Sequence, residues 1–165
     1  MANEEKNKIV KYLTELIEKH GGIIEKYLGD GIIAFFPSEC ETALLCALEM
    51  QEVMNDLRKE FSEKNLPELK IGIGVHYGNV LIGTAGDASR MSEISISKDL
   101  SILQHAESAT KRYNKSIIVT KEAVAAAAKE AKSKGKKFNF FGKKVEEAMG
   151  HELYYIYNEN ISREL

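Results

Sequence analysis

A tight turn bounded by glycine on both sides constrains the fold of this chain more than any other feature. Residues 29–31 read Gly-Asp-Gly, and glycine adopts the positive φ angles of hairpin turns without steric cost. Apolar residues lead into and out of the turn, which predicts two antiparallel strands within residues 21–37 with Asp30 at the tip. An aspartate in such a turn either hydrogen-bonds its own backbone or presents its carboxylate to a ligand, and the turn alone leaves both readings open.

Helical periodicity recurs on both sides of this hairpin. Apolar residues spaced three and four apart predict helices, which we place at residues 8–19, 38–64, 99–113 and 121–133. Ser38 and Thr120 stand where a helix N-cap is expected, because a short hydroxyl side chain satisfies a free backbone N–H there.

Short segments that are rich in β-branched residues, or that alternate apolar and polar residues, lie between the predicted helices in the sequence. They predict strands within residues 69–77, 80–84, 93–97, 116–120, 138–141 and 153–157. Gly72 and Gly74 interrupt the first of these, and glycine in a strand is tolerated where another backbone or a ligand approaches closely. Helices and hairpins alternate, so the chain is predicted to be an α+β sandwich.

Composition narrows the functional classes. The 165 residues carry a net charge of −2, which gives no reason to expect nucleic acid or an anionic membrane as a partner. Cys40 and Cys46 match neither a disulfide nor a metal motif, and no apolar run is long enough to span a membrane. We expect a cytoplasmic protein with one domain over residues 1–165, frayed at 1–6 and 158–165.

Two sequence blocks together resemble the class III nucleotidyl cyclase catalytic domain. The first block has three parts, which are His20-Gly21-Gly22, Lys26-Tyr27-Leu28-Gly29-Asp30 and Ile33-Ala34-Phe35. The second is the glycine pattern from Ile71 to Gly83, written Ile-Gly-Ile-Gly-Val-His-Tyr-Gly-Asn-Val-Leu-Ile-Gly. The resemblance covers residues 7–157 and implies a ferredoxin-like βαββαβ core.

The resemblance also implies a chemistry. Members of this family make the 3′-oxygen of a nucleoside triphosphate attack its own α-phosphorus, a reaction that depends on positioning and charge neutralisation. Two aspartates bridge two Mg²⁺ or Mn²⁺ ions. An asparagine and an arginine four residues later steady the ribose and the developing charge, and two lysines hold the phosphates and read adenine. The site is shared across a head-to-tail dimer.

This chain keeps only part of that set. The resemblance assigns the turn aspartate, a metal ligand, to Asp30 and the adenine-reading lysine to Lys26, which could equally be a plain surface lysine. It places Ser101 at the asparagine, His105 at the arginine and Met149 at the phosphate lysine. Each of the three is a degenerate position, because histidine lacks the guanidinium fork and methionine carries no charge.

These losses predict a protein with little cyclase activity on its own, since one transition-state partner is worth about 10²–10³ in rate. Three readings remain. The chain is a dimerising, regulatory or nucleotide-binding module; or it is an adenylate cyclase subunit, a phosphorus-oxygen lyase, completed by a partner; or it is a ferredoxin-like scaffold with no nucleotide site. The partners implied are a second cyclase-like subunit, in a homodimer or a heterodimer, and a nucleoside triphosphate with weakly held Mg²⁺ or Mn²⁺.

Two further expectations concern strand pairing and histidine. Nothing in residues 1–20 resembles the family's mid-sheet first strand, which carries the other metal-bridging aspartate. We therefore expect the tail or a second copy of the chain to fill that slot, unless the chain is a piece of a longer protein. His76 and His151 have no further ligand at metal-site spacing, which predicts surface or packing roles.

Overall fold

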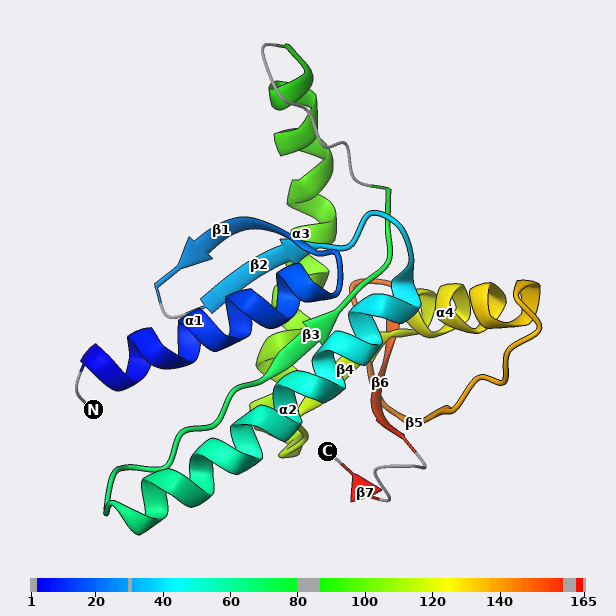
Figure 1. The fold of residues 1–165 in the computed structure, drawn as a ribbon. Coiled ribbons are helices and arrows are strands. Elements are labelled where there is room, and N and C mark those ends of the chain that lie inside the picture. The colour runs from blue at the N-terminus through cyan, green and yellow to red at the C-terminus, as the bar shows by residue number, and fades with distance from the viewer. Residues whose placement is uncertain (1–2, 30, 80–86, 159–162, 165) are drawn as a thin grey trace. The chain divides into compact units, whose positions relative to one another are not determined.

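The computed structural model describes residues 3–29, 31–79, 87–158 and 163–164 (Figure 1). The chain divides into two compact units, residues 1–71 and 72–165. The prediction of a single domain stays a prediction. The strands fall into two hydrogen-bonded sheets, one in each unit.

The first unit contains the predicted hairpin and two helices. Its elements are α1 (Asn3–Lys19), β1 (Ile23–Leu28), β2 (Gly31–Phe35) and α2 (Cys40–Glu63). Strands β1 and β2 pair antiparallel, with Leu28 opposite Gly31 beside the turn. The hairpin prediction is therefore confirmed, and Asp30 itself lies outside the described residues.

A core between α1 and α2 organises this unit. It consists of one apolar face from each helix, namely Ile9, Leu13, Met54, Leu57 and Phe61. Burying five such side chains contributes on the order of 1.5–3 kcal/mol each. At the end of α1, Gly22 is obligatory, because a Cβ there would lie 2.6 Å from the Ile17 side chain and 2.9 Å from that of Phe36.

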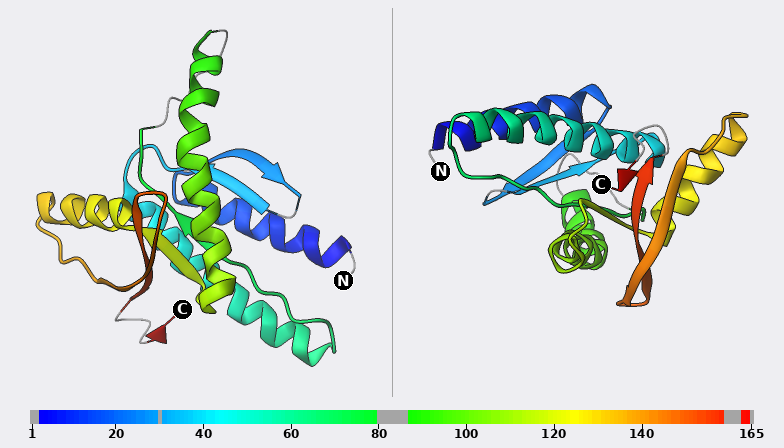
Figure 2. Two further views of the ribbon diagram at one scale, coloured as in Figure 1. Left: turned by 180° about the vertical axis from the view of Figure 1, so that it is seen from behind. Right: turned by 90° about the horizontal axis from the view of Figure 1, so that it is seen from below.

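The second unit is built on a mixed sheet. Its elements are β3 (Ile73–Val75), α3 (Asp87–Tyr113), β4 (Ile117–Thr120), α4 (Lys121–Ser133), β5 (Phe140–Ala148), β6 (His151–Asn158) and β7 (Arg163–Glu164). The strand order is β3-β4-β6-β5, with β3 parallel to β4 and the other pairs antiparallel. Figure 2 shows β5 and β6 as a long hairpin beside α4. This antiparallel-rich α+β architecture agrees with the predicted fold class.

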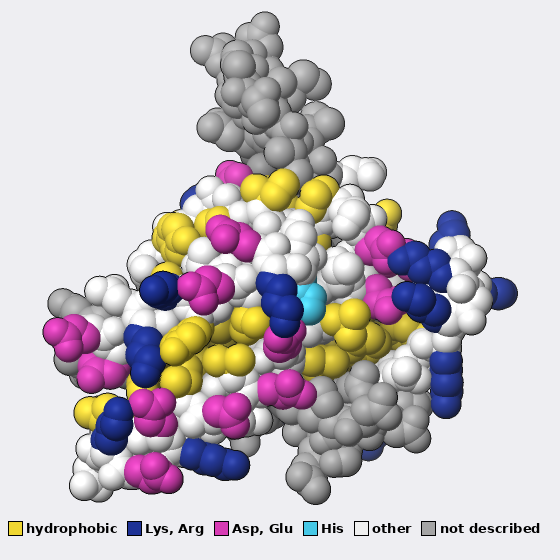
Figure 3. Space-filling view, viewed as in Figure 1, with side chains coloured by type: hydrophobic (Ala, Val, Ile, Leu, Met, Phe, Trp, Pro, Cys, Tyr) yellow, Lys and Arg dark blue, Asp and Glu magenta, His cyan; other side chains and the backbone are white. Residues whose placement is uncertain are grey.

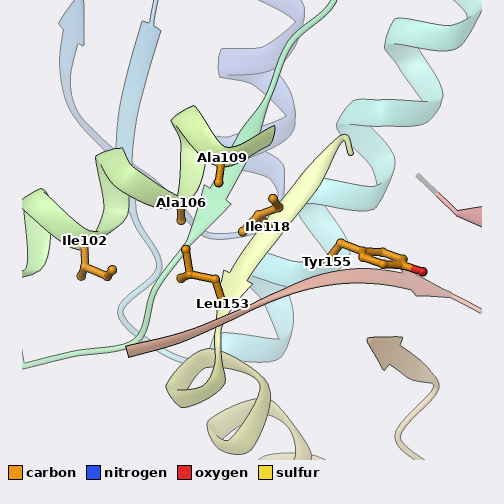
Figure 4. Packing of buried hydrophobic residues seen from close by; sticks show 6 residues of the cluster. All are labelled: Ile102, Ala106, Ala109, Ile118, Leu153 and Tyr155. Carbon is orange, nitrogen blue, oxygen red and sulfur yellow. The ribbon is translucent and has the colours of Figure 1, made fainter. Parts of the chain in front are cut away.

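Helix α3 packs directly on this sheet. Its buried face presents Ile102, Ala106 and Ala109, which meet Ile118 of β4 and two residues of β6, Leu153 and Tyr155 (Figure 4). The small side chains of the two alanines let α3 approach the sheet closely. A Cβ on Gly74 would lie 2.7 Å from the backbone nitrogen of Glu107. The expectation that another backbone approaches this glycine-interrupted strand is therefore confirmed.

The structure corrects two local predictions and leaves a third untested. Residues 93–97 were expected to form a strand but belong to α3, which begins at Asp87. The N-cap of α2 is Glu39 rather than Ser38, and its side chain makes no capping hydrogen bond. The strand expected at 80–84 lies outside the described residues.

The predicted cap of α4 is confirmed, because the Thr120 hydroxyl oxygen accepts a hydrogen bond from the Ala123 backbone N–H. Near the carboxyl end of the chain, β7 pairs with the end of β6, so part of the tail joins the sheet. Whether any segment fills the slot of the family's first strand stays a prediction.

Within the described residues, no helix is both long and apolar enough to cross a membrane. Figure 3 shows Lys and Arg side chains mixed with Asp and Glu side chains over α1 and α2. This mixing fits the small net charge of −2 and offers no large field of one sign on this face.

Candidate functional site

The β1–β2 hairpin carries the two residues that match the family pattern best. Lys26 lies exposed on β1, and Asp30 falls at the turn outside the described residues. A bulge between Ile24 and Lys26 places one extra residue in β1 relative to β2. Three large apolar side chains are also exposed on this strand, namely Ile23, Tyr27 and Leu28.

His105 is held in a charged cluster with β5. Its Nε2 lies 3.1 Å from Oε2 of Glu146, and the other carboxylate oxygen of Glu146 pairs with the guanidinium of Arg112. Burial alone would raise the pKa of Glu146, but the hydrogen bonds from His105 and Arg112 outweigh it and hold that pKa below its usual value. Glu146 is therefore ionised at neutral pH, and His105 donates its Nε2 proton to it.

A second contact of His105 cannot also be a hydrogen bond. Nη2 of Arg112 lies 3.2 Å from the same Nε2 atom. Because that nitrogen carries the proton given to Glu146, it has no lone pair for Arg112. The Glu146 carboxylate thus stands between the His105 imidazole and the Arg112 guanidinium, which lie two turns apart on the same face of α3.

A β-bulge aims Glu146 at this helix. Lys144 pairs with Tyr154 and Glu146 with Leu153, so Val145 is the extra residue. Leu153 points into the core beneath α3, and a residue directly opposite shares its face of the sheet. Without the bulge, Val145 would oppose Leu153, and Glu146 would point to the other face of the sheet.

Ser101 and Met149 lie in different settings. Ser101 is exposed on α3, one helical turn before His105. Met149 and Gly150 form the two-residue turn between β5 and β6, with φ angles of 54° and 79°. Positive φ at both central residues is the pattern of a type I′ turn, and the Met149 side chain is 58% exposed at its tip. The Met149 side chain offers no charge to a phosphate.

The described residues do not assemble the carboxylate pair that the family's two-ion chemistry requires. Among them, the group of three or more metal-capable side chains is His76, Glu122 and His151, all in the second unit. It contains none of the residues that the cyclase pattern assigns to metal. The described residues therefore offer no two-ion centre for Mg²⁺ or Mn²⁺.

Comparison with known proteins decides the family. A family model described as the adenylate and guanylate cyclase catalytic domain matches residues 4–152. An adenylate cyclase from Anabaena cylindrica is 32% identical over 123 residues, or 72% of this chain. This chain belongs to the class III cyclase family.

Solved structures of two adenylyl cyclases share the fold. A bacterial light-regulated adenylyl cyclase superimposes with a TM-score of 0.60 at 17% identity, over 92% of this chain and 43% of that chain. The adenylyl cyclase CyaB from P. aeruginosa gives a TM-score of 0.54 at 14% identity, over 94% of this chain and 82% of that chain. The curated relatives are much longer than this chain. The matched part spans 24% of the Anabaena cylindrica protein, 6% of an adenylate cyclase from Dictyostelium discoideum and 18% of one from Rhizobium meliloti.

Sequence reasoning missed Glu146 and Arg112. Arg112 lies seven residues after His105, which is two helical turns and therefore the same face of α3. That spacing was readable in the sequence. The position of Glu146 was not, because it depends on the bulge at Val145.

Proposed function

We propose that this chain is a cyclase-homology domain that binds or regulates rather than catalysing on its own. The observation that supports this most directly is the state of His105. At the position where the family pattern has an arginine for the developing negative charge, this chain has a histidine that donates to Glu146. A group already committed to a carboxylate is poorly placed to neutralise a phosphoryl oxygen.

The surroundings of His105 point the same way. Glu146 adds a negative charge on the face of α3 that the pattern uses for the ribose and the reacting phosphate, and negative charge there opposes the transition state. The neighbouring guanidinium of Arg112 is paired with the same carboxylate. The positive charge on this face is therefore balanced within the protein.

The retained features suit assembly and nucleotide contact. Lys26 is exposed on β1, so its ammonium is accessible to a ligand. Exposed Ile23, Tyr27 and Leu28 on the same strand are large apolar side chains of the kind that subunit interfaces cover. We therefore propose that the hairpin contributes to dimerisation with a cyclase-like subunit and that Lys26 contacts a nucleoside triphosphate.

Activity and binding assays separate this proposal from its alternatives. The purified chain is incubated with ATP and Mn²⁺, and cyclic AMP is measured; we expect none above the background rate. ATP binding is then measured by calorimetry, where Lys26→Ala should weaken binding and Lys143→Ala, an exposed strand lysine on β5, should not.

Each contrary result has a distinct meaning. Cyclic AMP formation by the chain alone would refute the non-catalytic role. Formation only after a second cyclase-like subunit is added would identify a half-site enzyme. Absence of ATP binding in both the original chain and the Lys143→Ala variant would leave a scaffold without a nucleotide site.

A further inference from the structure

Three strand ends meet at one edge of the second unit's sheet. Strand β3 ends at Val75, β4 ends at Thr120, and β6 begins at His151. Because β3 and β4 are parallel and β6 is antiparallel to both, the carboxyl ends of the first two lie beside the start of the third. The residues at or just beyond these points include two histidines and a glutamate, namely His76, Glu122 and His151.

These three side chains converge. One ligand atom from each lies within 4.8 Å of the other two. Nδ1 of His151 is 2.9 Å from Oε1 of Glu122, and the rings of His76 and His151 stand edge to face with centroids 5.2 Å apart. Ligand atoms that share a tetrahedral Zn²⁺ at about 2.0–2.1 Å lie about 3.4 Å from one another, so only small side-chain shifts separate this cluster from a metal centre.

We propose that His76, Glu122 and His151 bind a divalent transition-metal ion of the Zn²⁺ class. Two imidazoles and one carboxylate are a donor set that suits Zn²⁺ and is poor for Mg²⁺, which prefers six oxygens. Three protein ligands leave a fourth position for water or another ligand. The site rests on residues other than those of the nucleotide proposal and stands independently of it.

His76 already has the outer partner that metal-binding histidines use. Its Nε2 lies 3.0 Å from Oδ1 of Asp99, and its Nδ1 lies 2.9 Å from the Thr120 hydroxyl oxygen. Since Asp99 accepts the Nε2 proton, Nδ1 carries the lone pair, and Nδ1 is the nitrogen we assign to the metal. A carboxylate behind a ligand histidine fixes its tautomer and orientation. Asp99 is therefore a positioning residue.

The charge balance distinguishes this cluster from the other histidine–glutamate pairs. Glu49 pairs with Lys19 as well as His20, and Glu146 pairs with Arg112 as well as His105. Within the described part of the chain, Glu122 forms its ion pair with a histidine only, and the adjacent Lys121 pairs with Glu152. A divalent cation would supply the positive charge that a lysine or arginine supplies in the other two pairs.

The four histidines of the chain provide a test with its own control. The chelator-treated full chain is titrated with ZnCl₂ while the imidazole signals of all four histidines are followed by NMR. We expect the rings of His76 and His151 to shift together and saturate at one equivalent, with His20 and His105 unchanged. The proposal would be overturned if the imidazole signals of His20 or His105 shifted more than those of His76 and His151, or if no ring showed a saturable shift.

Variants and unfolding temperatures supply a second measurement. Zn²⁺ at about 100 times its Kd should raise the Tm by about 5–10 °C, whereas Mg²⁺ at the same concentration should not. Glu122→Gln and His151→Gln should each weaken binding at least tenfold, Asp99→Asn about 10–100-fold, and the control Glu49→Gln not at all.

The ligand residues chosen for substitution are half-exposed, so these variants are expected to fold; His76 is left intact because its side chain is 5% exposed and bonded at both nitrogens. Far-UV circular dichroism checks the fold of each variant. Zn²⁺ affinity that is unchanged in a folded Glu122→Gln protein, or a Mg²⁺ shift equal to that of Zn²⁺, would refute the site.

Discussion

Gly74 offers a sharp test of the packing between β3 and α3. In a strand with ordinary φ, replacing glycine by alanine normally stabilises a protein by about 0.4–1 kcal/mol, because the unfolded chain loses freedom. Here the new Cβ would lie 2.7 Å from the Glu107 nitrogen and 2.9 Å from the Leu103 carbonyl oxygen. Both atoms belong to the backbone of α3, so the helix must move as a whole.

We expect Gly74→Ala to destabilise the protein. Overpacking costs about 1–3 kcal/mol, and a contact with backbone belongs at the upper end of that range. A loss of about 3 kcal/mol lowers the Tm of a chain of this size by roughly 6–12 °C. Thermal unfolding followed by circular dichroism measures the change.

Gly72 provides the matched comparison, because its Cβ would meet a side chain instead. The nearest atom is Oγ1 of Thr110, and Thr110→Ala removes that atom. Gly72→Ala should therefore lower the free energy of unfolding by at least about 1 kcal/mol less in the Thr110→Ala background than in the original chain. Glu107→Ala should give Gly74→Ala no such relief. A neutral or stabilising Gly74→Ala would show that α3 does not lie against β3 as described.

Three further outcomes follow from individual side chains. Thr120→Ala should cost about 1–2 kcal/mol in urea unfolding, because the cap to Ala123 is lost, and Thr120→Ser should recover most of it. The hydrogen bond from His20 leads the effects that hold the pKa of Glu49 below its ordinary value of 4.5. The ionised Glu49 therefore stabilises the fold above that pH, and the stability difference between the original chain and Glu49→Gln should shrink as the pH falls below 4.5 in acid titrations. Burial, with the charge of Glu49, raises the pKa of the Cys46 thiol to about 12, so iodoacetamide should label it at pH 7 only after unfolding.

Local chemistry made much of the fold predictable. The Gly-Asp-Gly turn fixed the first hairpin, and Thr120 marked the start of α4, since both signals act within a few residues. Gly74 correctly predicted a close backbone, although not which one, whereas the close neighbour of Gly72 is the Thr110 side chain. The segment 93–97 failed as a strand because its short apolar alternation continues into the helical pattern that follows, and the helix prevailed.

The contacts that matter for function depend on register and topology. His76 and His151 are far apart in sequence, so a search for ligands at metal-site spacing found none, whereas the β3-β4-β6 order brings them together. Glu146 likewise could not be placed beside His105 without knowing that Val145 is an extra residue. Periodicity assigns faces to regular strands, and one inserted residue reverses that assignment.

The bulge at Val145 also limits what an arginine at position 105 could contact. An arginine in place of His105 would set a second guanidinium against the carboxylate that already holds Arg112, and a salt bridge to Glu146 would hold it there. Freeing that arginine for a ligand would require Glu146 to be replaced as well, or its strand to shift by one residue. The extra residue in β5 therefore limits the effect of any single substitution on α3, because the Glu146 carboxylate that it directs toward the helix stays in place.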